Sequence, residues 1–140
     1  MSQPATSSRT PKVLLVDDEP LMRLLYKRHI EKAGYQFLTA KSAQEGLLIA
    51  QAEKPGVVVL DVMLSGPSGL AALRRLKAHD ETKSIPVIIF TSAMSQDATR
   101  QEADLSGATL FLTKPISPER LVNEIKRLVP IPAGTNPEPA

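Results

Sequence analysis

The sequence predicts an α/β fold, a doubly wound three-layer sandwich around a five-stranded parallel sheet. Four short apolar runs carry many β-branched residues without alternation, a pattern typical of strands buried on both faces. These runs are Val13–Val16, Val57–Leu60, Val87–Phe90 and Leu110–Thr113. They alternate with segments of helical periodicity, which indicates βαβ units with right-handed crossovers. The composition agrees with a globular domain, since 42% of the residues are apolar and 23% are charged.

The strands follow from these runs in chain order. They are expected at residues 12–17, 35–40, 57–61, 86–91 and 108–113. The second strand differs from the others, because apolar and polar side chains alternate along residues 35–39. Alternation is typical of a half-buried strand. The second strand could therefore lie at an edge of the sheet.

The helices fill the gaps between the strands. Their apolar faces comprise Met22, Leu25, Tyr26, His29, Ile30 and Ala33, then Ala43, Leu47 and Ala50, then Leu70, Leu73 and Leu76, and last Leu121, Ile125 and Leu128. Gly34 suits the end of the first helix, and Ser42 with Glu45 forms a capping box before the second. Ser117–Pro118 provides a cap and a first-turn proline for the last helix. Segment 95–105 has few apolar residues, so we expect its helix to be the most weakly held.

Length and composition restrict the protein class. The 140 residues suit one domain at 11–129, with disordered tails at 1–10 and 130–140 that are rich in Pro, Ser, Thr, Gly and Ala. The chain has no Cys, which excludes disulfides and thiolate sites. No apolar stretch reaches the ~18 residues of a membrane span, and the first residues lack the apolar core of a secretory signal. We therefore expect a cytoplasmic protein without a membrane partner. Its formal charge of +2 does not indicate nucleic-acid binding.

Reactive side chains follow the predicted strands. Asp17 and Asp18 follow the first, Asp61 the third, Thr91 the fourth and Lys114 the last. The carboxyl ends of parallel strands share one sheet edge, where ligands bind in such folds. Carboxylates close together raise one another's pKa unless a cation neutralises them, and oxygen ligands of this kind suit Mg²⁺.

This set of side chains suits phosphoryl transfer, with Asp61 as nucleophile, the Asp pair as metal ligands, and Thr91 and Lys114 as donors to phosphate oxygens. Taken singly, Asp17, Asp18 and the Lys-Pro pair have simpler explanations. An acidic residue after a strand is often a helix cap, and an isolated Lys-Pro carries no information. The ordered combination on successive strand ends is what favours a site. Neither GxxxxGK[ST] nor GxGxxG is present.

The motifs around these positions identify a known family. The chain resembles the receiver domain of two-component response regulators in several motifs. These are VLLVDDEP at 13–20, VVVLDVML at 57–64 with Ser68-Gly69, PVIIFTSA at 86–93 and GATLFLTKPI at 107–116. The resemblance extends from Val13 to Val129. It implies a flavodoxin-like receiver fold with strand order 2-1-3-4-5.

The resemblance also assigns roles by position. Asp61 would be the phospho-acceptor and a Mg²⁺ ligand, together with Asp17, Asp18 and the backbone carbonyl of Met63. Thr91 and Lys114 would contact the phosphoryl group, and Lys114–Pro115 would be a cis peptide. Thr91 and Phe111 would form the conformational switch. Met63 and Ala93 occupy the positions that tune the lifetime of the aspartyl phosphate. Neither can hold an attacking water strongly, which predicts slow hydrolysis unless both residues are purely structural.

Two positions depart from the family pattern. The family usually carries Pro four residues after the acceptor, where this chain has Ser65 followed by Gly66-Pro67. Residues 108–110 read Ala-Thr-Leu where DNA-binding members often carry an Asp pair, which weakens the case for their mode of dimerisation.

The first helix has a second candidate function. Leu21 and Leu24 lie off its buried face, and by resemblance they and Ile116 could dock the histidine-bearing helix of a phosphodonor. Isolated exposed leucines are equally ordinary. The basic residues Arg23, Lys27, Arg28 and Lys32 are interpreted as a solvated face, and His29 as a packed core histidine.

We therefore expect a stand-alone receiver, a signalling domain that catalyses only its own phosphotransfer and dephosphorylation. Its partners would be a histidine kinase or a histidine phosphotransfer protein and a downstream protein target. Direct DNA binding is not expected, because only eleven residues follow Val129. One alternative is a phosphorylation-independent pseudo-receiver that only binds proteins. Another is a phosphohydrolase, disfavoured because such enzymes commonly need a second Asp where this chain has Met63.

Overall fold

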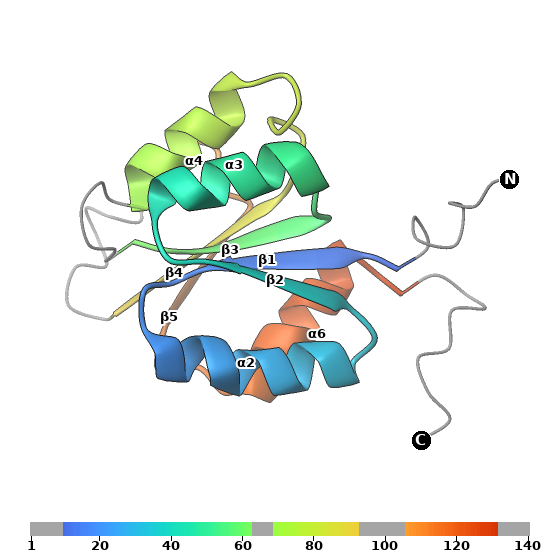
Figure 1. The fold of residues 1–140 in the computed structure, drawn as a ribbon. Coiled ribbons are helices and arrows are strands. Elements are labelled where there is room, and N and C mark those ends of the chain that lie inside the picture. The colour runs from blue at the N-terminus through green and yellow to red at the C-terminus, as the bar shows by residue number, and fades with distance from the viewer. Residues whose placement is uncertain (1–9, 63–68, 93–105, 132–140) are drawn as a thin grey trace, which may run out of the picture.

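The computed structural model describes residues 10–62, 69–92 and 106–131 (Figure 1). Its elements in chain order are β1 (Lys12–Val16), α2 (Pro20–Lys32), β2 (Gln36–Ala40), α3 (Ala43–Glu53), β3 (Val57–Asp61), α4 (Gly69–Ala78), β4 (Val87–Ser92), β5 (Leu110–Lys114) and α6 (Pro118–Leu128). Every predicted strand is present, with bounds shifted by no more than two residues. The weakly held helix predicted at 95–105 lies outside the described residues, as do positions 1–9 and 132–140 of the two tails.

The five strands form one parallel sheet in the order β2-β1-β3-β4-β5. The predicted α/β fold and strand order are therefore confirmed. The partly alternating strand, β2, lies at an edge. In the interior, β1 and β3 are direct neighbours, with Val16 opposite Leu60. This pairing brings together the carboxyl ends of β1 and β3, which are separated by about forty residues of sequence.

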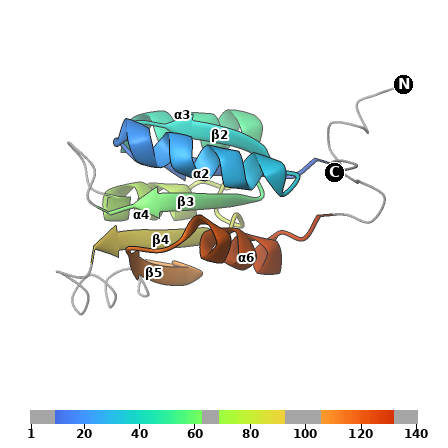
Figure 2. The same cartoon turned by 90° about the horizontal axis from the view of Figure 1, so that it is seen from below.

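Helices cover both faces of the sheet. Figure 1 shows α3 and α4 on one face and α2 and α6 on the other. In Figure 2, α2 lies nearer the β2 edge and α6 nearer the β5 edge. Successive strand residues point to opposite faces. Leu14 accordingly joins the core under α3 and α4, and Leu15 the core under α2 and α6. Both faces of the central strands are buried, which explains their unalternated apolar runs.

Two of the predicted helix starts are largely confirmed. The Ser42 hydroxyl accepts a hydrogen bond from the Glu45 N–H, and the Ser117 hydroxyl accepts one from the Arg120 N–H. The capping box at α3 departs from the expected pattern, because the Glu45 carboxylate accepts from the Lys41 N–H at 2.7 Å. The carboxylate thus satisfies a donor just before the cap.

The prediction that His29 packs in the core is wrong. Its side chain is about one-third exposed, at the margin where α2 meets α6. One ring nitrogen, Nδ1, lies 3.2 Å from the Leu25 carbonyl oxygen, and Nε2 lies 3.6 Å from a Glu119 carboxylate oxygen. Tyr26 and Ile30 are the fully packed residues of this helix. The apolar face is therefore narrower than the sequence spacing indicated.

Gly69 fixes the start of α4 against the end of β3. A Cβ at this position would lie 2.2 Å from the Asp61 carbonyl oxygen, so no other residue fits without moving the backbone. The Gly69 N–H donates to the Val62 carbonyl at 3.1 Å. Within the described parts of the chain, no helix has the length and apolarity needed to cross a membrane.

Candidate functional site

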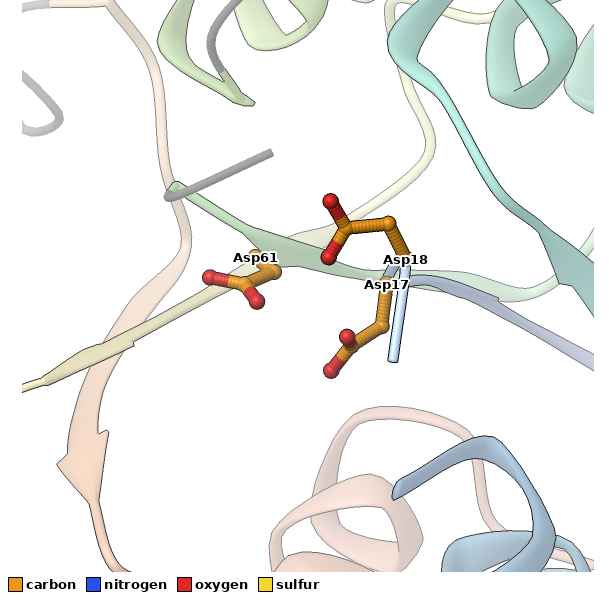
Figure 3. Close-up of side chains that lie close together, drawn as sticks. All are labelled: Asp17, Asp18 and Asp61. Atoms are coloured by element: carbon orange, nitrogen blue, oxygen red, sulfur yellow. The ribbon is translucent and has the colours of Figure 1, made fainter. Parts of the chain in front are cut away.

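Three carboxylates meet at the carboxyl edge of the sheet. Asp17 and Asp18 follow β1, and Asp61 is the last residue of β3. Because β1 and β3 are adjacent, one oxygen from each of these side chains lies within 4.8 Å of the others. Figure 3 shows the three side chains projecting into the space beyond the two strands. The structure thus brings together the acidic residues that the sequence singled out.

Asp17 is fully buried, and its two carboxylate oxygens differ. Oδ1 accepts a hydrogen bond from the Glu19 N–H at 2.9 Å, whereas Oδ2 has no hydrogen-bond partner. Burial raises the pKa of Asp17, and the negative charge of Asp61 adds to this effect. The Glu19 N–H and the Lys114 ammonium oppose it. A buried, unsatisfied carboxylate oxygen is costly, and a cation beside it removes that cost.

Lys114 places a positive charge between two of these carboxylates. Its Nζ lies 3.1 Å from Asp61 Oδ2 and 3.7 Å from Asp17 Oδ2. The ammonium also lies 4.8 Å from the centre of the Phe90 ring, within the range of a cation–π contact. The ammonium thus pairs with two of the three clustered carboxylates. The donor set is entirely oxygen, and with the buried Oδ2 of Asp17 it fits a hard divalent cation such as Mg²⁺.

The remaining predicted site residues lie on β4, β5 and the adjoining loops. Thr91 lies in β4 opposite Thr113 of β5, which places its backbone at the same sheet edge. Phe111 is buried in the core under α3 and α4. The Lys114–Pro115 peptide bond is cis, the geometry that the family resemblance implied. Met63 and Ala93 lie outside the described residues, so the structure does not place them.

The predicted docking residues lie on α2, which follows the Asp pair, and in the loop after β5. Leu21 and Leu24 are 75% and 59% exposed. Together with Met22, Leu25 and Arg28 they line a surface hollow of about 560 Å³ on α2. Ile116 is partly buried, and its carbonyl accepts a hydrogen bond from the Tyr26 hydroxyl at 3.0 Å. The loop after β5 is thus attached to α2.

Sequence reasoning missed two residues at the site. Phe90 is the last apolar residue of its run, and its pattern gave no sign of a contact with Lys114. Arg23 was interpreted as part of a solvated basic face, which is wrong for this residue: its Nη1 donates to the Asp17 carbonyl at 2.8 Å. Lys27, Arg28 and Lys32 are exposed, as that interpretation required. The one available signal was position, because Arg23 alone of the four lies on the first turn of α2.

Comparison with known proteins agrees with the family resemblance seen in the sequence motifs. A family model described as the response regulator receiver domain matches residues 13–126. Protein PilH of Pseudomonas aeruginosa is 36% identical over 118 residues, which cover 84% of this chain and 97% of PilH. The phosphate regulon transcriptional regulatory protein PhoB of the same species is 37% identical over 117 residues, but this chain spans only 51% of PhoB.

A solved structure extends the comparison to three dimensions. The chemotaxis protein CheY4 of Vibrio cholerae superposes with a TM-score of 0.80 at 30% identity. The superposition covers 86% of this chain and 99% of CheY4. Sequence motifs, sheet order and the acidic cluster at the strand ends therefore agree with one assignment. The chain belongs to the response regulator receiver domain family.

Proposed function

We propose that this protein accepts a phosphoryl group on Asp61 from a histidine kinase or a histidine phosphotransfer protein. It would then signal through phosphorylation-dependent protein contacts, or pass the group on in a phosphorelay. The observation that carries this proposal is the placement of Asp61. Its carboxylate is only 4% exposed, lies at the carboxyl edge of the sheet, and has both the acid pair and the Lys114 ammonium as neighbours.

Four groups would hold Mg²⁺: the carboxylates of Asp17, Asp18 and Asp61 and, by family resemblance, the backbone carbonyl of Met63. The bound ion would neutralise negative charge on the transferring phosphoryl group. Asp17 Oδ2 supports this assignment, because it is buried without a hydrogen-bond donor beside two further carboxylates. We propose Mg²⁺ because the small ion keeps positions for water and for a phosphate oxygen when few carboxylates bind it.

In the proposed transfer, a carboxylate oxygen of Asp61 attacks the phosphorus of a phosphohistidine in line. An O–P bond forms and the P–N bond breaks. The electron pair of the broken bond remains on the imidazole nitrogen of the donor, which takes up a proton from solvent. Lys114 pairs with one phosphoryl oxygen, and the Thr91 hydroxyl donates to another. After phosphorylation, Phe111 would change its packing and so alter the protein surface at β5.

We place partner docking at the exposed leucines of α2. Leu21 and Leu24 lie on the helix that follows the Asp pair, and the hollow that they line with Arg28 would offer an apolar surface to a helix of the phosphodonor. The carbonyl of Ile116 is fixed to α2 through Tyr26, so the loop after β5 would form the other side of the contact.

Labelling with a small acyl phosphate tests the phospho-acceptor. With Mg²⁺ present, intact-mass measurement should show one added phosphoryl group on the wild type and none on Asp61→Asn, which loses its nucleophile but little volume. Calorimetric titration should show weaker Mg²⁺ binding for Asp18→Ala. Undiminished labelling of Asp61→Asn would contradict the assignment. An unlabelled but folded wild type would favour a pseudo-receiver that acts only through binding.

A further inference from the structure

The Asp17 residue is held at every polar atom except one. Its N–H donates to the Ala40 carbonyl at 3.1 Å, and its Oδ1 accepts from the Glu19 N–H at 2.9 Å. Its carbonyl oxygen accepts from Arg23 Nη1 at 2.8 Å. The remaining atom, Oδ2, is buried without a hydrogen-bond partner and lies 3.7 Å from Lys114 Nζ. The hydrogen bonds around Asp17 thus leave only Oδ2 without a hydrogen-bond donor, and the Asp17 carboxylate belongs to the acidic cluster.

Arg23 is the only side chain among these partners, because Ala40 and Glu19 contribute backbone groups. It lies on the first turn of α2, where its own N–H donates to the Glu19 carbonyl. Glu19 makes no side-chain cap for this helix. The Arg23 guanidinium therefore links the first turn of α2 to the backbone at the end of β1, in addition to the hydrogen bond between the Asp17 carboxylate and the Glu19 N–H.

The hydrogen bond acts on a peptide plane that two acidic residues share. The Asp17 carbonyl and the Asp18 N–H belong to the same planar peptide unit. Holding the carbonyl restricts the backbone torsions on either side of that plane. These torsions set the direction in which the Asp18 side chain leaves the backbone and the position of the Asp17 carboxylate. A group that never touches a bound ion can therefore set how well both carboxylates are placed for it.

We propose that Arg23 is a positioning residue for the divalent-cation site: it holds the Asp17 carbonyl so that the carboxylates of Asp17 and Asp18 converge. This inference rests on the proposed function, since it takes the acidic cluster to bind Mg²⁺. In addition, the proposal requires a positively charged side chain, Arg23, to support a site that binds a cation. Electrostatics alone would favour the opposite arrangement, because a guanidinium repels Mg²⁺.

The direction in which Mg²⁺ affinity changes in Arg23→Ala distinguishes a purely electrostatic role from a positioning role. If Arg23 acted only through its charge, Arg23→Ala would strengthen Mg²⁺ binding. If it positions the ligands, the same substitution weakens binding, by about tenfold on the scale typical of residues that orient metal ligands. Arg23→Lys keeps the charge but loses the planar, five-donor guanidinium, so we expect an affinity between those of wild type and Arg23→Ala.

The experiment is a calorimetric titration of the full chain with Mg²⁺ at constant ionic strength. Lys27→Ala is the matched control, because Lys27 is an exposed cation on the same helix. We expect its affinity to stay within about twofold of wild type. Equal or tighter Mg²⁺ binding by Arg23→Ala would overturn the proposal. If Arg23→Ala does not fold, Arg23→Lys decides: affinity equal to wild type would overturn the proposal, and weaker affinity supports it.

A second measurement distinguishes positioning from general damage to the site. The rate of labelling by an acyl phosphate is followed as a function of Mg²⁺ concentration. For Arg23→Ala, the half-saturating concentration should rise about tenfold while the rate at saturation stays near that of wild type. An unchanged half-saturating concentration with a lower maximal rate would overturn the positioning role. If wild type itself fails to bind Mg²⁺, the proposed metal site is wrong, which is a separate outcome.

Discussion

At the scale of single residues, Lys114 combines two opposing effects. Its ammonium pairs with Asp61 and lies close to the buried oxygen of Asp17, so it stabilises carboxylates that would otherwise repel one another. The same positive charge competes with any cation that binds there. Its position over the Phe90 ring restricts where the ammonium can move. In the proposed transfer, Lys114 would exchange a carboxylate partner for a phosphoryl oxygen.

Replacing Lys114 by Ala should separate these effects. We expect Lys114→Ala to bind Mg²⁺ about tenfold more tightly, because a like charge within 4 Å of two ligands is removed. Some phosphorylation by acyl phosphate should remain, but the response of β4 and β5 to a phosphoryl analogue should be lost. Calorimetry measures the first effect and NMR chemical shifts the second. Equal shifts in mutant and wild type would contradict a role in the switch.

The lifetime of the aspartyl phosphate is a second prediction at this scale. Met63 and Ala93 occupy family positions at which polar side chains orient the attacking water, and neither offers a strong hydrogen bond. We expect slow hydrolysis in the wild type and faster decay in Met63→Asn and Ala93→Glu, which supply groups able to hold that water. Decay of the labelled protein, followed by intact mass, measures this. If neither polar variant decays faster, these side chains do not set the lifetime.

At the scale of elements, the end of α6 is attached to the start of β2. The Tyr35 hydroxyl donates to the Val129 carbonyl at 2.6 Å, and the ring is buried. Gly56 lies against the Val129 side chain, because a Cβ there would approach it to 2.9 Å. Tyr35 precedes β2 and Gly56 precedes β3, so these contacts lie at the amino ends of the strands, whereas the acidic cluster lies at carboxyl ends. The α6 helix is therefore held at its far end, and its first turn borders the functional edge.

The buried Tyr35 hydroxyl should make the free energy of unfolding depend on pH. Burial raises the pKa of Tyr35 from its usual 10.0 to about 12. Between these values the folded protein keeps a proton that the unfolded chain has lost, so stability falls as the pH rises. Below that window, Tyr35→Phe should lower the free energy of unfolding by about 1 kcal/mol through loss of the hydrogen bond.

The stability difference between wild type and Tyr35→Phe isolates this group, because all other residues titrate in both proteins. Urea unfolding at several pH values should show a constant difference up to about pH 10. Above that pH the advantage of the wild type should shrink, at no more than about 1.4 kcal/mol per pH unit. A difference that stays flat to pH 12 would contradict the role of Tyr35.

At the scale of the whole molecule, the sheet order creates the site and links it to stability. The fold places three acidic groups at one edge, and burial raises the pKa of Asp17. Burying carboxylates in close proximity opposes folding, and a cation that binds only the folded state compensates for this. The free energy of unfolding should therefore depend on Mg²⁺.

We expect Mg²⁺ at about 100 times its dissociation constant to raise the free energy of unfolding by about 2.7 kcal/mol. Without metal, the folded state holds the Asp17 proton to higher pH than the unfolded chain, whose pKa is near 3.8. Stability should therefore fall as the pH rises above that value. Asp17→Asn should weaken this dependence and remove most of the Mg²⁺ effect. Urea unfolding of both proteins, with and without Mg²⁺, measures this; a Mg²⁺ effect retained in full by Asp17→Asn would contradict it.

Much of this protein could be predicted from its sequence, because the relevant signals are local. Unalternated apolar runs predicted the central strands, since residues buried on both faces of a sheet must all be apolar. Ser42 and Ser117 predicted two helix starts through hydrogen bonds that span only three residues. The acidic site was predictable too, because parallel strands end at one edge and Asp17, Asp18 and Asp61 follow two of them.

Tertiary structure alone decided how individual side chains are used. The spacing of α2 could not show that His29 lies at a margin or that Arg23 turns back to the Asp17 carbonyl. Both outcomes depend on where β1, α6 and α2 meet in space. The same holds for Phe90 beneath Lys114 and for the close approach of Gly69 to Asp61. Sequence patterns report the periodicity of one element, whereas contacts between elements depend on packing that no single segment encodes.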